Sequence, residues 1–112
     1  SFGVELVHGF GTDASGIRKF WQFLADRGIQ SIYVEGGSAT HGYLYDAFLE
    51  DSELLDRVLF YLAPKIIGGM GALGAVGGKG LGRLAEVPLL ENFEVEKLGG
   101  DLKISGNFNF YF

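Results

Sequence analysis

The sequence predicts one α/β domain with a mixed, mostly parallel sheet flanked by helices. Three observations support this prediction. The length of 112 residues suits a single domain, two helical patterns alternate with short apolar runs, and the chain closes in two alternating stretches joined by a glycine turn. Because strands separated by helices usually pair in parallel, whereas hairpin strands pair antiparallel, we expect the order strand, helix, strand, helix, strand, loop, hairpin over residues 1–112.

The first strand and helix are indicated by an apolar run and a helix cap. Residues 4–7 (VELV) predict a short strand that ends near His8. Asp13 is a good N-cap, because its carboxylate can accept the free N–H groups of a first helical turn. The apolar residues behind it recur at helical spacing on one face: Ile17, Phe20, Trp21 and Leu24. Gly28 is expected to end this helix.

A second strand and helix follow directly. Residues 29–34 predict the strand, and Ser38 or Thr40 can open the helix behind it. This helix is expected to turn three apolar side chains inward: Leu44, Ala47 and Phe48. We interpret the acidic residues on it and just after it as a solvated face rather than a site: Asp46, Glu50, Asp51 and Glu53.

The third predicted strand covers residues 58–63. It is apolar almost throughout (VLFYLA), which is typical of a strand buried on both faces. Pro64 is expected to end it, because proline cannot donate a backbone hydrogen bond. A glycine-rich loop, residues 68–82, comes next, with a short helical turn expected near residues 81–85.

The end of the chain predicts a hairpin. Residues 93–96 and 102–105 each alternate with a period of two, and residues 98–101 (LGGD) between them are typical of a tight turn. The last residues place three aromatic side chains on one side: Phe108, Phe110 and Phe112. An apolar face of this kind needs to be covered by the core or by a partner subunit.

Composition narrows the class of partner. The net charge of −5 argues against nucleic acid, since phosphate backbones are bound by basic faces. No apolar run has the length of a membrane span, so no membrane partner is expected. The absence of cysteine excludes disulfides and thiol chemistry and fits a cytoplasmic protein. A chain that begins at Ser1 without methionine is expected to be a fragment or a trimmed protein.

Three glycine patterns are candidates for a ligand site. The first, Gly9-x-Gly11-x-x-Ala14, follows a predicted strand and precedes a helix, with Glu35 ending the next strand. This arrangement is typical of a dinucleotide-binding module. However, Asp13 would repel a pyrophosphate at this position, and it is well explained as a helix cap.

The second and third patterns lie further along the chain. Gly69-x-Gly71-x-x-Gly74 is in the glycine-rich loop, where the many glycines disfavour a following helix, and it indicates a surface loop or a flap over a ligand. The third pattern is EGGS, residues 35–38, where a strand turns into a helix. Amides at a helix start favour anions and glycines admit a phosphate, although a tight turn explains this pattern equally well.

The two histidines are far apart and belong to no metal-binding motif, so no metal site is predicted. His41 follows the EGGS turn and is placed to touch a ligand, although a position on the helix surface is the simpler interpretation. We interpret His8 as structural.

Three motifs in order resemble one known family: VEGG at residues 34–37, APKIIGG at 63–69 and LGGDLKISG at 98–106. This set resembles the C-terminal half of the RibD-type reductase domain of riboflavin biosynthesis, which has the dihydrofolate-reductase-like fold. VEGG alone is a weak signal, whereas the three motifs at these spacings are specific. The resemblance extends over nearly the whole chain, so we interpret residues 1–112 as one partial domain.

The resemblance implies an NADPH-dependent reductase that converts the ribosyl group of a pyrimidine ribosylamine phosphate to ribityl. The substrate would be 5-amino-6-(5-phosphoribosylamino)uracil or its diamino precursor, and hydride would pass from the nicotinamide to the opened sugar. Carried over by position, Glu35 matches the substrate-side carboxylate. The segment that lies along NADPH matches Gly36, Gly37, Ser38, Ala39, Thr40, His41, Gly42 and Tyr43. No catalytic residue is identified.

Two alternatives stay open beside the reductase. The chain could be an inactive half-domain that self-associates, most simply as a homodimer, because the resemblance lacks the N-terminal half of the domain. It could also be a generic dinucleotide-binding module that uses Gly9 and Gly11.

Overall fold

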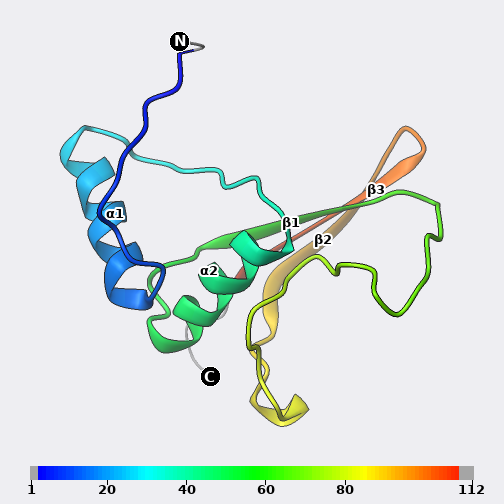
Figure 1. The fold of residues 1–112 in the computed structure, drawn as a ribbon. Coiled ribbons are helices and arrows are strands. Elements are labelled where there is room, and N and C mark those ends of the chain that lie inside the picture. The colour runs from blue at the N-terminus through cyan, green and yellow to red at the C-terminus, as the bar shows by residue number, and fades with distance from the viewer. Residues whose placement is uncertain (1–2, 109–112) are drawn as a thin grey trace.

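The structure is a computed structural model that describes residues 3–108. Its elements in chain order are α1 (Ala14–Asp26), α2 (Ser38–Glu50), β1 (Arg57–Leu62), the 3-10 helix η1 (Leu84–Glu86), β2 (Leu90–Leu98) and β3 (Asp101–Phe108). The two helices pack on each other, and the β2–β3 hairpin extends away from them (Figure 1). The described residues therefore form a small α/β domain.

Helix α1 forms where its sequence signals predict it. One carboxylate oxygen of Asp13 accepts the N–H of Gly16 at 2.8 Å, which caps the first turn. The helix ends at Asp26, and Gly28 takes the left-handed backbone conformation (φ 82°) that commonly ends helices. Both the predicted cap and the predicted stop are confirmed.

Replacing Asp13 with alanine is expected to lower the free energy of unfolding by about 1 kcal/mol, because the N–H of Gly16 loses its only side-chain acceptor. Chemical denaturation followed by circular dichroism measures the change. Asp13→Asn is the control, because asparagine is an equally good cap residue and should leave the midpoint nearly unchanged. Equal losses in both variants would contradict a capping role.

The core is built on the inward faces of the two helices. Ile17 of α1 packs with Leu44 and Ala47 of α2 and with Leu54, and all four are buried. The predicted core face of α1 is confirmed at Trp21, which packs against this cluster and donates its indole N–H to the carbonyl oxygen of Leu54 at 2.9 Å. The indole therefore fixes the chain as it leaves α2.

A second apolar contact joins α2 to the sheet. Phe48 is fully buried, and its ring centroid lies 4.5 Å from that of Phe108 on β3. The ring of Tyr45 lies 6.5 Å from the same Phe108 ring. The predicted inward positions on α2 are thus confirmed, and Phe108 is half-buried against this helix. Phe110 and Phe112 lie outside the described residues.

The predicted hairpin is also confirmed. β2 and β3 pair antiparallel up to Leu98 and Asp101, and Gly99 in the turn has a φ of 58°. β1 pairs antiparallel with the other edge of β3, which gives the strand order β1-β3-β2. Because β3 is central, its midpoint is the most buried part of the sheet, at Ser105 and Gly106.

The prediction of a mostly parallel sheet is wrong for the described residues, since both strand pairs are antiparallel. Residues 4–7 and 29–34 form no strand, although both were expected to. A strand requires hydrogen bonds to a neighbour, and within residues 3–108 β1 is hydrogen-bonded to no strand but β3. The second segment nevertheless runs near β1, because the side chain of Tyr33 lies close enough to interact with that of Tyr61.

The burial predicted for the third strand is likewise wrong. β1 ends at Leu62, two residues before Pro64, but Tyr61 and Leu62 at this end are exposed. Because no strand of the described part of the chain pairs with its outer edge, the end of β1 lacks the neighbours that would bury both faces. The helical turn expected near residues 81–85 is present as η1, shifted by a few residues.

Candidate functional site

The candidate site begins at the turn into α2. Gly37 is the N-cap residue, and no side chain caps the first turn of this helix. A Cβ atom added at Gly37 would meet no atom within 4 Å, whereas one added at Gly36 would lie 2.9 Å from Thr40. The amides of the first helical turn are therefore approachable at Gly37, where the helix dipole favours an anion.

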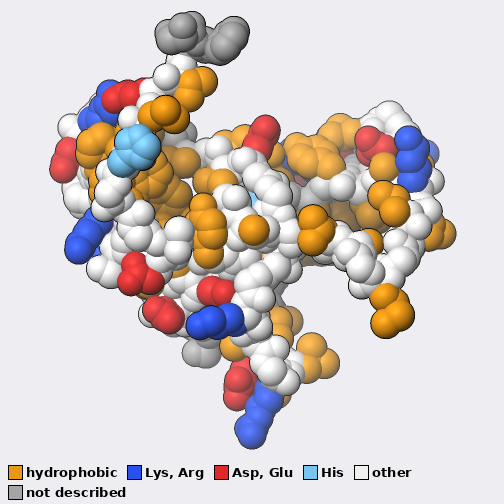
Figure 2. All heavy atoms as spheres, viewed as in Figure 1, with side chains coloured by type: hydrophobic (Ala, Val, Ile, Leu, Met, Phe, Trp, Pro, Cys, Tyr) orange, Lys and Arg blue, Asp and Glu red, His pale blue; other side chains and the backbone are white. Residues whose placement is uncertain are grey.

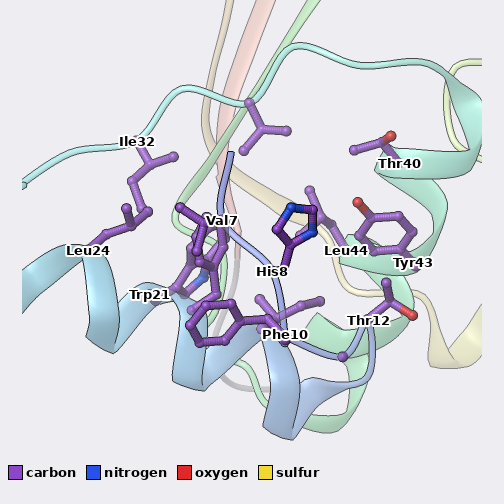
Figure 3. Close-up of a pocket in the computed structure, with 15 residues that line it drawn as sticks. Val7, His8, Phe10, Thr12, Trp21, Leu24, Ile32, Thr40, Tyr43 and Leu44 are labelled. Atoms are coloured by element: carbon purple, nitrogen blue, oxygen red, sulfur yellow. The ribbon is translucent and has the colours of Figure 1, made fainter. Parts of the chain in front are cut away.

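One side of α2 faces a cavity of about 500 Å³. The cavity lies between α1, α2 and the extended segments that precede each helix, and Figure 3 shows its lining side chains. Apolar side chains such as Val7, Leu24 and Ile32 lie toward α1 in this view. The polar side chains lie toward α2 and are His8, Thr12, Thr40 and Tyr43.

This cavity brings the first glycine pattern next to part of the predicted cofactor segment. Gly9 and Gly11 line it from the segment before α1, while Thr40 and Tyr43 line it from the predicted cofactor segment. Two segments about thirty residues apart in the chain thus face the same space. An apolar cavity with a few convergent polar groups is the common form of a small-molecule site.

The opposite side of α2 carries part of the glycine-rich loop. The N–H of Gly77 donates to the carbonyl oxygen of Ser38 at 2.9 Å. The Nδ1 atom of His41 lies 3.2 Å from the carbonyl oxygen of Ala75, so the tautomer protonated at Nδ1 donates to it. Gly42 is buried against the backbone of Gly77 and Gly78.

Asp46 completes this contact with both carboxylate oxygens. One oxygen accepts the N–H of Lys79 at 2.8 Å and the other accepts the N–H of Gly80 at 2.9 Å. These two bonds, first that of Lys79 and then that of Gly80, hold the pKa of Asp46 below its ordinary value of 3.8. The carboxylate is thus ionised at neutral pH, and it is the anion to which the loop amides donate.

The residues of the predicted cofactor segment therefore divide into three groups. Thr40 and Tyr43 line the cavity, whereas Ser38, His41 and Gly42 contact the glycine-rich loop. Gly36, Gly37 and Ala39 surround the open helix start without lining the cavity. Glu35, the predicted substrate carboxylate, is exposed at the end of the extended segment and also lies outside the cavity lining.

Sequence reasoning missed three residues. His8 was interpreted as structural and Thr12 was given no role, yet both line the cavity. Asp46 was assigned to a solvated face, yet it binds the loop. The glycine pattern at Gly9 was the available signal for the first two. For Asp46 the signal was Gly42 one turn before it, together with a loop rich in glycine amides.

Two further residues of the acidic face are paired with one cation. Arg18 on α1 pairs with Asp51 and Glu53 beyond the end of α2, with N–O distances of 2.6 Å and 3.0 Å. Within residues 3–108 no cluster of three or more His, Cys, Asp or Glu side chains is placed to hold a metal ion. None of the helices described there is long and apolar enough to cross a membrane.

Comparison with known proteins agrees with these features. The fold and the open helix start define an α/β domain with a candidate nucleotide-binding turn. A family model, the RibD C-terminal domain, matches residues 16–104, which include most of α1, all of α2 and most of the sheet. The chain therefore belongs to the RibD C-terminal domain family.

Three relatives carry the same description, riboflavin biosynthesis protein RibD. The protein of Bacillus amyloliquefaciens is 35% identical over 84% of this chain and 24% of its own length. The proteins of Haemophilus influenzae and Actinobacillus pleuropneumoniae are 33% and 32% identical, over 80% and 72% of this chain and 22% and 20% of their own lengths. The chain thus spans about a quarter or less of each relative.

Proposed function

We propose that this chain is the C-terminal part of an NADPH-dependent reductase domain of riboflavin biosynthesis, acting in the cytoplasm. The observation that carries the proposal is the match of the RibD C-terminal domain to residues 16–104. The structure supports it with an approachable helix start at Gly37 beside a cavity lined by Thr40 and Tyr43. The substrate is proposed to be a pyrimidine ribosylamine phosphate whose ribosyl group becomes ribityl.

The residues around the start of α2 would have different roles in binding the cofactor and the substrate. Amides at the start of α2 would bind a phosphate group of NADPH, because they lack side-chain acceptors and lie at the positive end of the helix dipole. Thr40 and Tyr43 would orient the cofactor from the cavity side, and Glu35 would contact the substrate. The cofactor supplies the hydride when bound, so the protein groups position rather than react.

The direct test is NADPH oxidation by the full-length protein with the pyrimidine ribosylamine phosphate as substrate. We expect absorbance of NADPH to fall only when protein and substrate are both present. A full-length protein that is inert with this substrate, in both the amino-uracil and the diamino forms, would overturn the proposed reaction.

Replacing Gly37 with leucine tests the cofactor segment. The backbone there is extended (φ −88°) and the added side chain enters open space, so the fold should tolerate it. We expect the Kd for NADPH, measured by fluorescence titration, to rise at least about tenfold, because the leucine blocks the approach to the amides. Gly74→Leu is the matched control. A side chain at Gly74 also enters open space, but Gly74 lies in the glycine-rich loop, outside the predicted cofactor segment.

The same variant separates the reductase from a generic dinucleotide-binding module. If Gly9 and Gly11 bound the pyrophosphate, Gly37→Leu would bind NADPH as tightly as the parent. Gly9 itself has a φ of 93°, so substitutions there would strain the backbone and give a less clear answer.

A second candidate is self-association through exposed apolar surface. The segment after β1 leaves four large apolar side chains almost fully exposed: Ile66, Ile67, Met70 and Leu73. Figure 2 shows hydrophobic side chains at the surface over this loop and the hairpin. Surfaces of this kind mark association sites, and we propose a homodimer. A monomer in a sedimentation experiment at micromolar concentration would overturn the proposed homodimer.

A further inference from the structure

The glycine-rich loop is attached to α2 along a single face of the helix. The four contact residues on α2 are Ser38, His41, Gly42 and Asp46. Residues three and four apart are neighbours on a helix surface, so these positions form one continuous stripe. Residues 75–80 of the loop lie along that stripe, and we call this set of contacts the latch.

The latch depends on a close approach of two backbones. A Cβ atom on Gly42 would lie 2.4 Å from the nitrogen of Gly78, and one on Gly78 would lie 2.7 Å from the carbonyl oxygen of Gly42. Gly78 also has a φ of 76°, which other residues rarely adopt. Glycines at both positions thus allow the contact but supply no side chain to hold it.

Asp46 supplies the side-chain contact that glycine cannot. It is the one residue of the stripe whose charged group binds the loop, and both of its oxygens are used. Charged acceptors make stronger hydrogen bonds to backbone N–H groups than neutral ones do. The part of the loop before residue 75 makes no such contact, and Ile66 is 98% exposed there.

We propose that Asp46 is a positioning residue, which holds residues 75–80 against α2 and thereby keeps the helix start in its cofactor-binding conformation. This inference rests on the proposed function, because it gives the latch a role in NADPH affinity. Its basis is that the latch residues Ser38, His41 and Gly42 belong to the same short segment as Thr40 and Tyr43, which face the cavity from the other side. The loop therefore supports the helix from behind.

The first readout is tryptic cleavage after Lys79, whose N–H is bound by Asp46. In the full-length Asp46→Ala variant we expect this cleavage to be about tenfold faster, because proteolysis follows the population of the opened loop. Cleavage after Lys65, outside the latch, should not change. Glu50→Ala is the matched control, since it removes a carboxylate from the exposed side of the same helix.

The second readout is the Kd for NADPH by fluorescence titration. We expect it to rise about threefold in Asp46→Ala, because binding must then select the smaller population with an ordered loop. Asp46→Asn should restore part of the affinity, since its carbonyl oxygen still accepts one hydrogen bond. Helix propensity cannot explain a loss, because alanine favours a helix more than aspartate does.

The outcomes separate this inference from the function on which it rests. Unchanged cleavage after Lys79 in Asp46→Ala would overturn the latch. Faster cleavage with unchanged NADPH affinity would overturn the positioning role and leave the reductase proposal standing. An unmodified protein that binds no NADPH would overturn the proposed function itself. Faster cleavage together with weaker binding, in Asp46→Ala but not in Glu50→Ala, supports the proposal.

Discussion

Replacing Phe48 with alanine is expected to lower the free energy of unfolding by about 3–5 kcal/mol, the usual cost of deleting a buried aromatic side chain. Phe48 is fully buried and packs against Phe108 at 4.5 Å and Tyr45 at 6.1 Å between ring centroids. Its loss would remove the shorter of the two described aromatic contacts between α2 and β3. A loss of this size is a large share of the stability of a small domain.

Urea denaturation monitored by circular dichroism measures this loss. Phe93→Ala is the matched control, because it deletes the same side chain from β2, where Phe93 is 58% exposed. We expect the control to shift the midpoint far less. Equal shifts in the two variants would show that Phe48 is not the contact between helix and sheet that the structure describes.

The second large effect is expected at Gly42, where alanine should lower the free energy of unfolding by about 1–3 kcal/mol through overpacking. An added Cβ would lie 2.4 Å from the nitrogen of Gly78 and 2.5 Å from the carbonyl carbon of Gly77. Both are backbone atoms, so no side-chain rotation relieves the contact. The loop must instead move away from α2.

The expected sign at Gly42 opposes simple helix propensity, which favours alanine over glycine by about 1 kcal/mol in a helix interior. Thermal denaturation, with Gly74→Ala as the control, measures which effect is larger. An alanine at Gly74 meets no atom within 4 Å and should be neutral or slightly stabilising. A Gly42→Ala variant more stable than the parent would contradict the close approach of loop and helix.

The parts of the fold that sequence predicted correctly depend on local signals. The carboxylate of Asp13 caps α1 by accepting the N–H of Gly16, only three residues further along the chain. The apolar spacing of Leu44, Ala47 and Phe48 fixes the inner face of α2. The turn around Gly99 brings β2 and β3 together. Each of these features is decided by residues close together in the chain.

Local sequence patterns did not predict which distant segments pair as strands. Residues 4–7 and 29–34 have the apolar pattern of strands, but they form none, because a strand exists only with a hydrogen-bonded neighbour. The same reason explains the exposed end of β1 at Tyr61 and Leu62. An apolar run therefore predicted strand character but could not show whether its partner was present.

By itself, the sequence determined both helices, the hairpin and the family, because caps, helical spacing and the ordered motifs are properties of neighbouring residues. Only the tertiary structure decided how the predicted cofactor segment is divided, with Thr40 and Tyr43 facing a cavity and Ser38, His41 and Gly42 facing the loop. The physical reason is that the two sides of a helix meet different parts of the chain. Asp46 likewise became a ligand of loop amides only once the fold placed Lys79 and Gly80 beside it.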